Sequence, residues 1–117
     1  MTSPLKFYRL DAKHRVVPCR DVMEWAACFE NNRIVARTQF ACGVTVSTVF
    51  LGLDHRWSFD GPPLVFETMV FEMDASGDGE QWRYSSWDDA LTGHKATVRR
   101  VKKLIEKAGL STKLAKA

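Results

Sequence analysis

The chain has 117 residues, of which 45% are hydrophobic and 26% charged, and this composition indicates one folded domain and excludes disorder of the whole chain. The net charge of +3 is unevenly distributed along the chain. Eight basic residues and one acid from Lys95 onward give +7, whereas nine basic and thirteen acidic residues before it give −4. No apolar run is long enough for a signal peptide or a membrane-spanning helix, and the three cysteines form no CxxC motif, so we expect a reduced cytoplasmic protein with no membrane partner.

The first third of the chain predicts two short strands and a helix. The strands fall at 5–10 and 14–17. Asp21 and, three residues later, Glu24 resemble a capping box, and the apolar residues that follow recur at helical spacing. We expect this helix to end at the asparagine pair 31–32, since Asn tolerates the left-handed conformation at a helix end.

Four longer strands are predicted in the middle of the chain, at 33–40, 44–51, 64–73 and 80–85. The first two are separated by three residues ending in Gly43, which is a common hairpin length. Because the neighbouring connections are also short, consecutive strands are expected to pair as an antiparallel meander.

The clearest helix begins at Ser86, a good N-cap residue, and carries an apolar stripe at steps of three and four up to Gly109. We therefore expect one α+β domain over residues 1–109 and a flexible tail at 110–117. Its architecture would be a single antiparallel sheet of about four to five strands, with two helices packed on one face.

The loop at 54–63 is the main candidate for a binding site, because it connects two strands that would hold it rigidly. Its candidate residues are Asp54, His55, Arg56 and Trp57. His is an acid, base or ligand near neutral pH, although Asp and His beside Gly and Pro are also ordinary turn residues.

Glu67 shares its face of a predicted strand with apolar residues, so its carboxylate needs a partner. Arg37 and Arg83, on flanking strands, are the candidate partners for an ion pair. A carboxylate that faces a ligand is the alternative interpretation.

His94 falls on the apolar stripe of the last helix, where a hydrogen-bonded core histidine is the simplest interpretation. Together, His55, Glu67 and His94 have the composition of a two-histidine, one-carboxylate metal site. Their spacing does not require such a site, and no motif indicates a cofactor.

The last helix also carries a basic patch, which consists of Lys95, Arg99, Arg100, Lys102 and Lys103. Such a patch attracts phosphate backbones, but it lacks interleaved aromatic residues. A solvated helix face is therefore favoured over nucleic-acid binding.

The segments Val46–His55 and Gly61–Phe71, with the sequences VSTVFLGLDH and GPPLVFETMVF, carry a resemblance to an uncharacterised family of small bacteriophage and prophage proteins. Shorter similar segments lie at 6–10, 17–25, 33–38, 83–87 and 93–94. The resemblance implies origin and location in the bacterial host cytoplasm, and no activity.

We expect a non-enzymatic accessory protein that binds a host or phage protein, with antagonism of a bacterial defence system as one role. A sheet face left uncovered by the helices would bind this partner or a second copy of the chain, and Val35, Arg37, Val65, Glu67, Met69 and Phe71 are its expected residues. One alternative is a small-molecule or nucleotide pocket beside the 54–63 loop, lined by His55, Arg56, Glu67 and Arg83. The other is an enzyme, either metal-dependent or using His55 and Glu67 as acid and base.

Overall fold

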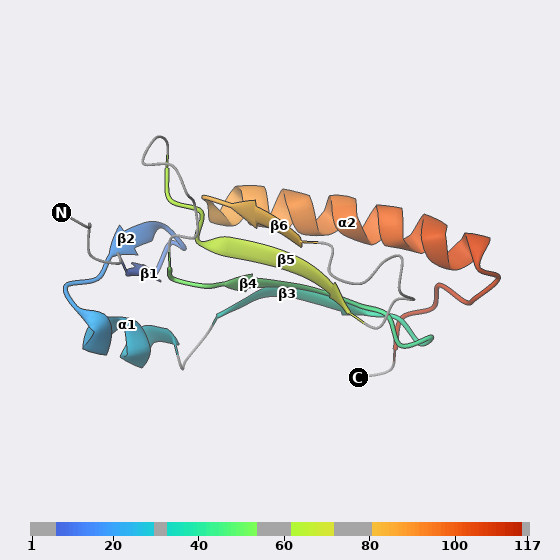
Figure 1. Cartoon of the computed structure of the whole chain (residues 1–117), viewed down its shortest axis with the longest axis horizontal. Helices are drawn as coiled ribbons and strands as arrows, with labels where there is room; N and C mark the ends of the chain where they lie inside the picture. The colour runs from blue at the N-terminus through green and yellow to red at the C-terminus, as the bar shows by residue number, and fades with distance from the viewer. Residues whose placement is uncertain (1–6, 30–32, 54–61, 72–80, 116–117) are drawn as a thin grey trace.

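The computed structural model describes residues 7–29, 33–53, 62–71 and 81–115, and within them the chain forms two antiparallel sheets and two helices (Figure 1). A two-stranded sheet pairs β1 (Tyr8–Leu10) with β2 (Val16–Pro18), and a four-stranded sheet has the order β3 (Ile34–Gln39), β4 (Thr45–Phe50), β5 (Phe66–Phe71), β6 (Gln81–Tyr84). The helices are α1 (Val22–Phe29) and α2 (Trp87–Lys107). The predicted α+β class and the four-stranded antiparallel meander are confirmed.

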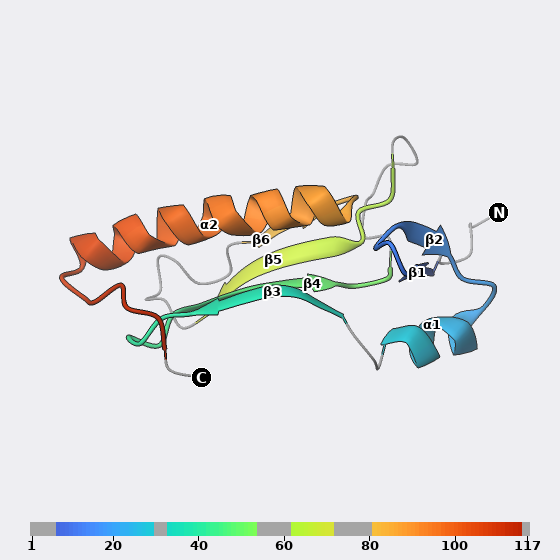
Figure 2. The same cartoon turned by 180° about the vertical axis from the view of Figure 1, so that it is seen from behind.

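The long helix α2 lies along one face of the four-stranded sheet, as Figures 1 and 2 show from opposite sides. Its predicted start is confirmed, because the Ser86 hydroxyl accepts a hydrogen bond from the Asp89 backbone N–H at 3.1 Å. At its other end, Gly109 adopts a φ of +76°, which a glycine accommodates without strain.

The core beneath α2 consists of two apolar clusters with a polar layer between them. One cluster lies toward the C-terminal half of α2 and contains Phe40, Val44, Val46, Val70, Val101 and Ile105. The other lies toward the N-terminal half and contains Phe50, Val65, Phe66 and Ala90. Between them lie Thr38, Thr48, Thr68 and His94, joined by hydrogen bonds, which we call the threonine–histidine belt.

From the sequence we expected both helices on one face of the four-stranded sheet. That expectation is wrong for the short helix α1, which packs against β1 beyond the end of that sheet (Figure 1). The Trp25 indole of α1 contacts the Phe7 ring, with 5.4 Å between ring centroids. β1 in turn is attached to the segment after β4, where the Tyr8 N–H donates to the Gly52 carbonyl at 2.8 Å. The helix α1 and the β1–β2 hairpin thus form one unit at the end of the molecule where α2 begins.

A β-bulge in β3 changes which of its residues face the core. Ile34 is paired with Val49 and Ala36 with Thr48, so Val35 is an extra residue between two pairs. Val35, expected on the uncovered face, packs instead against the cluster that contains Phe50. Val65, expected on the same face, is also wrongly placed by the sequence pattern, because it is fully buried within that cluster. Ile34 shares a face with Val49 and is 52% exposed.

The segment after α2 returns to the edge of β3. The Ala41 N–H donates to the Lys113 carbonyl and the Ala115 N–H to the Gln39 carbonyl, both at 2.8 Å, and Leu114 bridges Phe40. The stretch expected to be a flexible tail is therefore hydrogen-bonded to the sheet as far as Ala115.

Candidate functional site

The candidate loop residues Asp54, His55, Arg56 and Trp57 lie outside the described part of the chain. The residues on either side of the loop are described: Leu53 bridges Phe7, and the Pro62 carbonyl accepts a hydrogen bond from the Ser85 hydroxyl at 3.4 Å. The two strands that precede and follow this loop, β4 and β5, pair along their whole length. A role for the loop itself stays a prediction.

The face of the four-stranded sheet opposite α2 is the first candidate surface. Cross-strand pairs place Ile34, Val49, Glu67 and Arg83 in one row, and Arg37, Ser47, Met69 and Gln81 in the next. Phe71 follows in a third row and is 44% exposed. We call these nine residues the open face, because among the described elements only α2 packs extensively on this sheet, and it covers the other side.

Glu67 lies in the middle of the open face and forms an ion pair with Arg83. The two residues are direct cross-strand partners on β5 and β6, and the Arg83 Nε lies 3.1 Å from the Glu67 Oε2. Arg37 is opposite Ser47, one row away. Of the two partners that the sequence offered, Arg83 is the one bound, and the carboxylate, with only 11% of its side chain exposed, is compensated by it.

Replacing Arg83 by leucine should lower the free energy of unfolding by about 1–3 kcal/mol, because the buried Glu67 carboxylate would lose its charged donor. Adding Glu67→Gln to Arg83→Leu should recover part of this loss, since the remaining group is then neutral. Urea denaturation of both variants and of Arg37→Leu, which removes a charge from the next row, measures the effect. An equal loss in Arg37→Leu would show that the ion pair is not the cause.

His94 is 5% exposed and both of its ring nitrogens are engaged in the belt. Its Nε2 lies 2.9 Å from the Thr38 hydroxyl and its Nδ1 lies 2.8 Å from the Thr48 hydroxyl, which is itself 2.6 Å from that of Thr68. Burial lowers the pKa of His94 below its ordinary value, so the neutral imidazole is favoured. The histidine therefore acts as a hydrogen-bonding group of the core.

The sequence suggested a metal site made by His55, Glu67 and His94. Of these, Glu67 and His94 are described, and the structure does not bring them together. Thr68, the neighbour of Glu67 on β5, belongs to the belt beneath α2, so Glu67 and His94 lie on opposite faces of the sheet. His55 is outside the described residues. Within the described ranges, no group of three or more His, Cys, Asp or Glu side chains is placed to hold a metal ion.

The basic patch on α2 divides into two parts. Lys95, Arg99, Lys102 and Lys103 are exposed on the side of the helix away from the sheet. Arg100 is half-buried, and its guanidinium carbon lies 4.1 Å from the centroid of the Trp82 ring, a cation–π contact that joins α2 to β6. Arg100 thus contributes to packing, and the other four cations form the solvated face.

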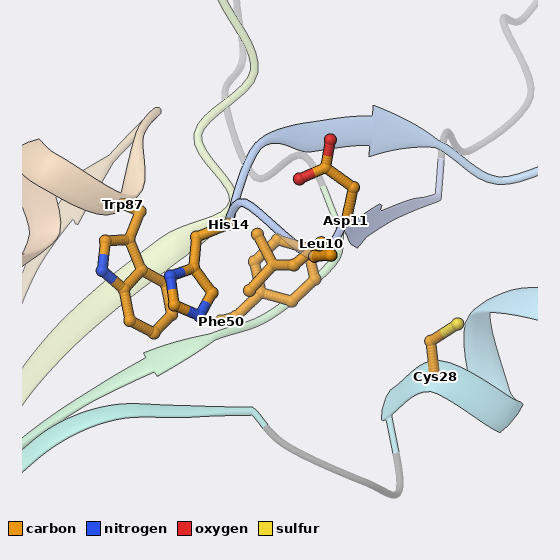
Figure 3. Close-up of a pocket in the computed structure, with 7 residues that line it drawn as sticks. Leu10, Asp11, His14, Cys28, Phe50 and Trp87 are labelled. Atoms are coloured by element: carbon orange, nitrogen blue, oxygen red, sulfur yellow. The ribbon is translucent and has the colours of Figure 1, made fainter.

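A junction that the sequence did not indicate lies where the β1–β2 turn meets the start of α2. His14, in the turn, stacks on the indole of Trp87, with 3.7 Å between ring centroids and an interplanar angle of 8°. A hollow of about 370 Å³ adjoins this pair and is lined mainly by Leu10, Asp11, Cys28 and Phe50 (Figure 3). The local signal for this turn is Asp11, a usual turn residue. His14 has a φ of +62°, a conformation that histidine adopts more often than most residues with a side chain.

The cysteines carry no disulfide in the structure, and all three are free. Burial raises the pKa of the Cys19 thiol, which opposes formation of the nucleophilic thiolate. Cys28 and Cys42 are exposed. Among the residues that the structure describes, no feature around these thiols indicates covalent catalysis.

Comparison of the chain with protein-family models, with curated proteins and with solved structures gave no match. Neither of the two described helices combines the length and the apolar character needed to cross a bilayer. The function is therefore argued from the two surfaces described above.

Proposed function

We propose that the protein is a non-enzymatic protein-binding module whose binding surface is the open face. The observation that carries this proposal is the placement of Ile34 and Phe71, which are 52% and 44% exposed on a face that α2 leaves uncovered. Val49 lies in the same row as Ile34, Met69 lies in the row between Ile34 and Phe71, and both are partly exposed. Apolar side chains gathered on a sheet face lose their contact with water when a partner covers them.

The polar residues of the open face would fix the orientation of a bound partner. Glu67 and Arg83 form an ion pair within the chain, so a partner that covers them would leave neither charge unpaired. Arg37 is exposed at the β3 edge and adds a positive charge there. A complementary partner surface would be apolar at its centre, with an acidic group placed opposite Arg37.

The proposed setting follows from the resemblance carried by Val46–His55 and Gly61–Phe71: a phage- or prophage-encoded accessory protein in the cytoplasm of a bacterial host. Its partner would be a host or phage protein, and a component of a bacterial defence system is the class that suits such an origin. A homodimer through the same face is the competing use of this surface.

The test replaces the two most exposed apolar residues of the open face, Ile34 and Phe71, by lysine in one variant. Leu104→Lys is the matched control, because Leu104 is also an exposed apolar residue (38%) but lies on α2. We expect the double variant to lose the partner recovered from bacterial lysate by the tagged wild-type protein, as quantified by mass spectrometry. The control should retain that partner.

Light scattering of the purified proteins separates the two uses of the face. A wild-type dimer that becomes monomeric in the Ile34→Lys/Phe71→Lys variant would assign the surface to self-association. A monomer that recovers the same proteins with or without these substitutions would reject the open face as the binding surface.

A further inference from the structure

The β1–β2 turn is built so that one histidine is held outward over a tryptophan. The Asp11 Oδ1 accepts hydrogen bonds from the backbone N–H groups of Lys13 and Arg15, each at 2.9 Å. The Asp11 Oδ2 accepts a third from the Arg15 Nε at 2.7 Å. His14 closes this turn with a φ of +62°, a strained conformation for a residue with a side chain.

Trp87, the stacking partner of His14, is itself held in place by a contact with the core. Trp87 is the first residue of α2, and its ring makes an edge contact with Phe66, with 6.4 Å between centroids and an interplanar angle of 80°. One flat face of the indole is covered by the imidazole at 3.7 Å. The outer ring of this pair belongs to His14, which is an exposed residue.

Two hollows adjoin the pair, and the residues that they share are His14 and Trp87. The first, of about 370 Å³, contains the apolar side chains of Leu10 and Phe50, which lie next to the imidazole in the view of Figure 3, together with the acidic Asp11. The second, of about 280 Å³, has a mixed lining of Lys13, Arg15, Val16, Ser85, Ser86 and Asp88. The ring pair thus lies between a hollow that offers apolar contact and a hollow that contains two cationic side chains.

We propose that this junction binds a mononucleotide. The base stacks on the imidazole of His14 above Leu10 and Phe50, where a flat aromatic ring finds both a π face and an apolar floor. The phosphate lies in the second hollow beside Lys13. Asp88 opposes an anion at the start of α2, and Arg15 is already held by Asp11, so Lys13 is the residue that carries the phosphate contact.

The strain at His14 fits this role. A glycine at position 14 would close the same turn without strain, since it adopts positive φ readily, but it would present no ring. The histidine therefore adds to this turn a ring that a glycine would not supply. The site is separate from the open face, so the proposal does not rest on protein binding.

The test compares adenosine monophosphate with adenosine by calorimetric titration, and follows the indole N–H signal of Trp87 by NMR. Both ligands should bind and shift that signal. His14→Gly, which keeps the turn and removes the ring, should weaken both ligands about tenfold. His14→Asn serves as a second variant, because Asn also tolerates positive φ.

Lys13→Ala should weaken adenosine monophosphate several-fold and leave adenosine unchanged. Lys95→Ala, on the exposed side of α2, is the matched control and should alter neither affinity. The proposal is overturned if neither ligand binds at millimolar concentration, or if affinity is unchanged in His14→Gly and His14→Asn. It is also overturned if both lysine variants weaken the nucleotide equally, since that would indicate nonspecific attraction of phosphate.

Discussion

Gly52→Ala should lower the free energy of unfolding by about 2–5 kcal/mol, by combining backbone strain with a steric overlap. Gly52 has a φ of +72°, which an alanine adopts only at a cost. A Cβ at this position would overlap with the Trp25 indole and would lie 3.0 Å from the Tyr8 carbonyl oxygen. Because those two residues belong to α1 and β1, the substitution should detach the N-terminal unit from the end of β4.

Gly109→Ala is the matched control for this prediction. Gly109 also has a positive φ, of +76°, but a Cβ there would meet nothing within 4 Å. It should therefore show the strain alone, about 1–2 kcal/mol. Urea denaturation and amide hydrogen exchange in β1 measure the two effects. Equal losses in the two variants would show that the close approach of Trp25 to Gly52 contributes nothing.

Acidification should destabilise the protein between pH 6.5 and the lower pKa of folded His94. In the unfolded chain this histidine takes up a proton near its ordinary pKa of 6.5, whereas burial among the belt threonines opposes the charged form in the folded state. The contribution of neutral His94 is fully present above pH 6.5. It is lost as the pH falls, by up to about 1.4 kcal/mol per pH unit for one proton.

His94→Ala should remove this pH dependence and, at neutral pH, cost about 2–5 kcal/mol, because it leaves a cavity and removes the partner of the Thr38 and Thr48 hydroxyls. Urea denaturation at a series of pH values tests both points. A slope that persists in His94→Ala would assign the acid sensitivity to other groups.

Two carboxylates titrate in a different window, which keeps the histidine effect separate. A backbone hydrogen bond from Arg15 lowers the pKa of Asp11, and a side-chain hydrogen bond from Arg20 lowers the pKa of Glu24. Their stabilising contributions are present above their ordinary pKa values of 3.8 and 4.5 and are lost as the pH falls further. The pH window of the His94 effect therefore lies above the windows of these two carboxylates.

Much of the secondary structure was predictable because it depends on neighbouring residues. Ser86 caps α2 as expected, and Asp21 accepts a hydrogen bond from the Glu24 N–H at 2.9 Å at the start of α1. The antiparallel order of β3 to β6 also follows from short connections. These features are encoded within a few residues of where they occur.

The features that local patterns did not indicate depend on contacts between distant segments. The bulge at Val35 exchanges the faces of two residues, and alternation in the sequence gives no sign of it. α1 lies beside β1 because Trp25 finds room above Gly52, 27 positions later in the chain. The pairing of His14 with Trp87 brings together two residues 73 positions apart, neither of which belongs to a motif.

The threonine–histidine belt allows α2 only one position along its own axis. Moving the helix by one turn, about 5.4 Å, would carry the imidazole over aliphatic or aromatic carbon and leave hydroxyl groups without acceptors. If apolar residues replaced the belt, moving α2 along its axis would break no hydrogen bonds and would cost far less free energy. The same hydrogen bonds tie β3, β4 and β5 to one place on α2, so a molecule that approaches the other side meets strands already held in a fixed arrangement.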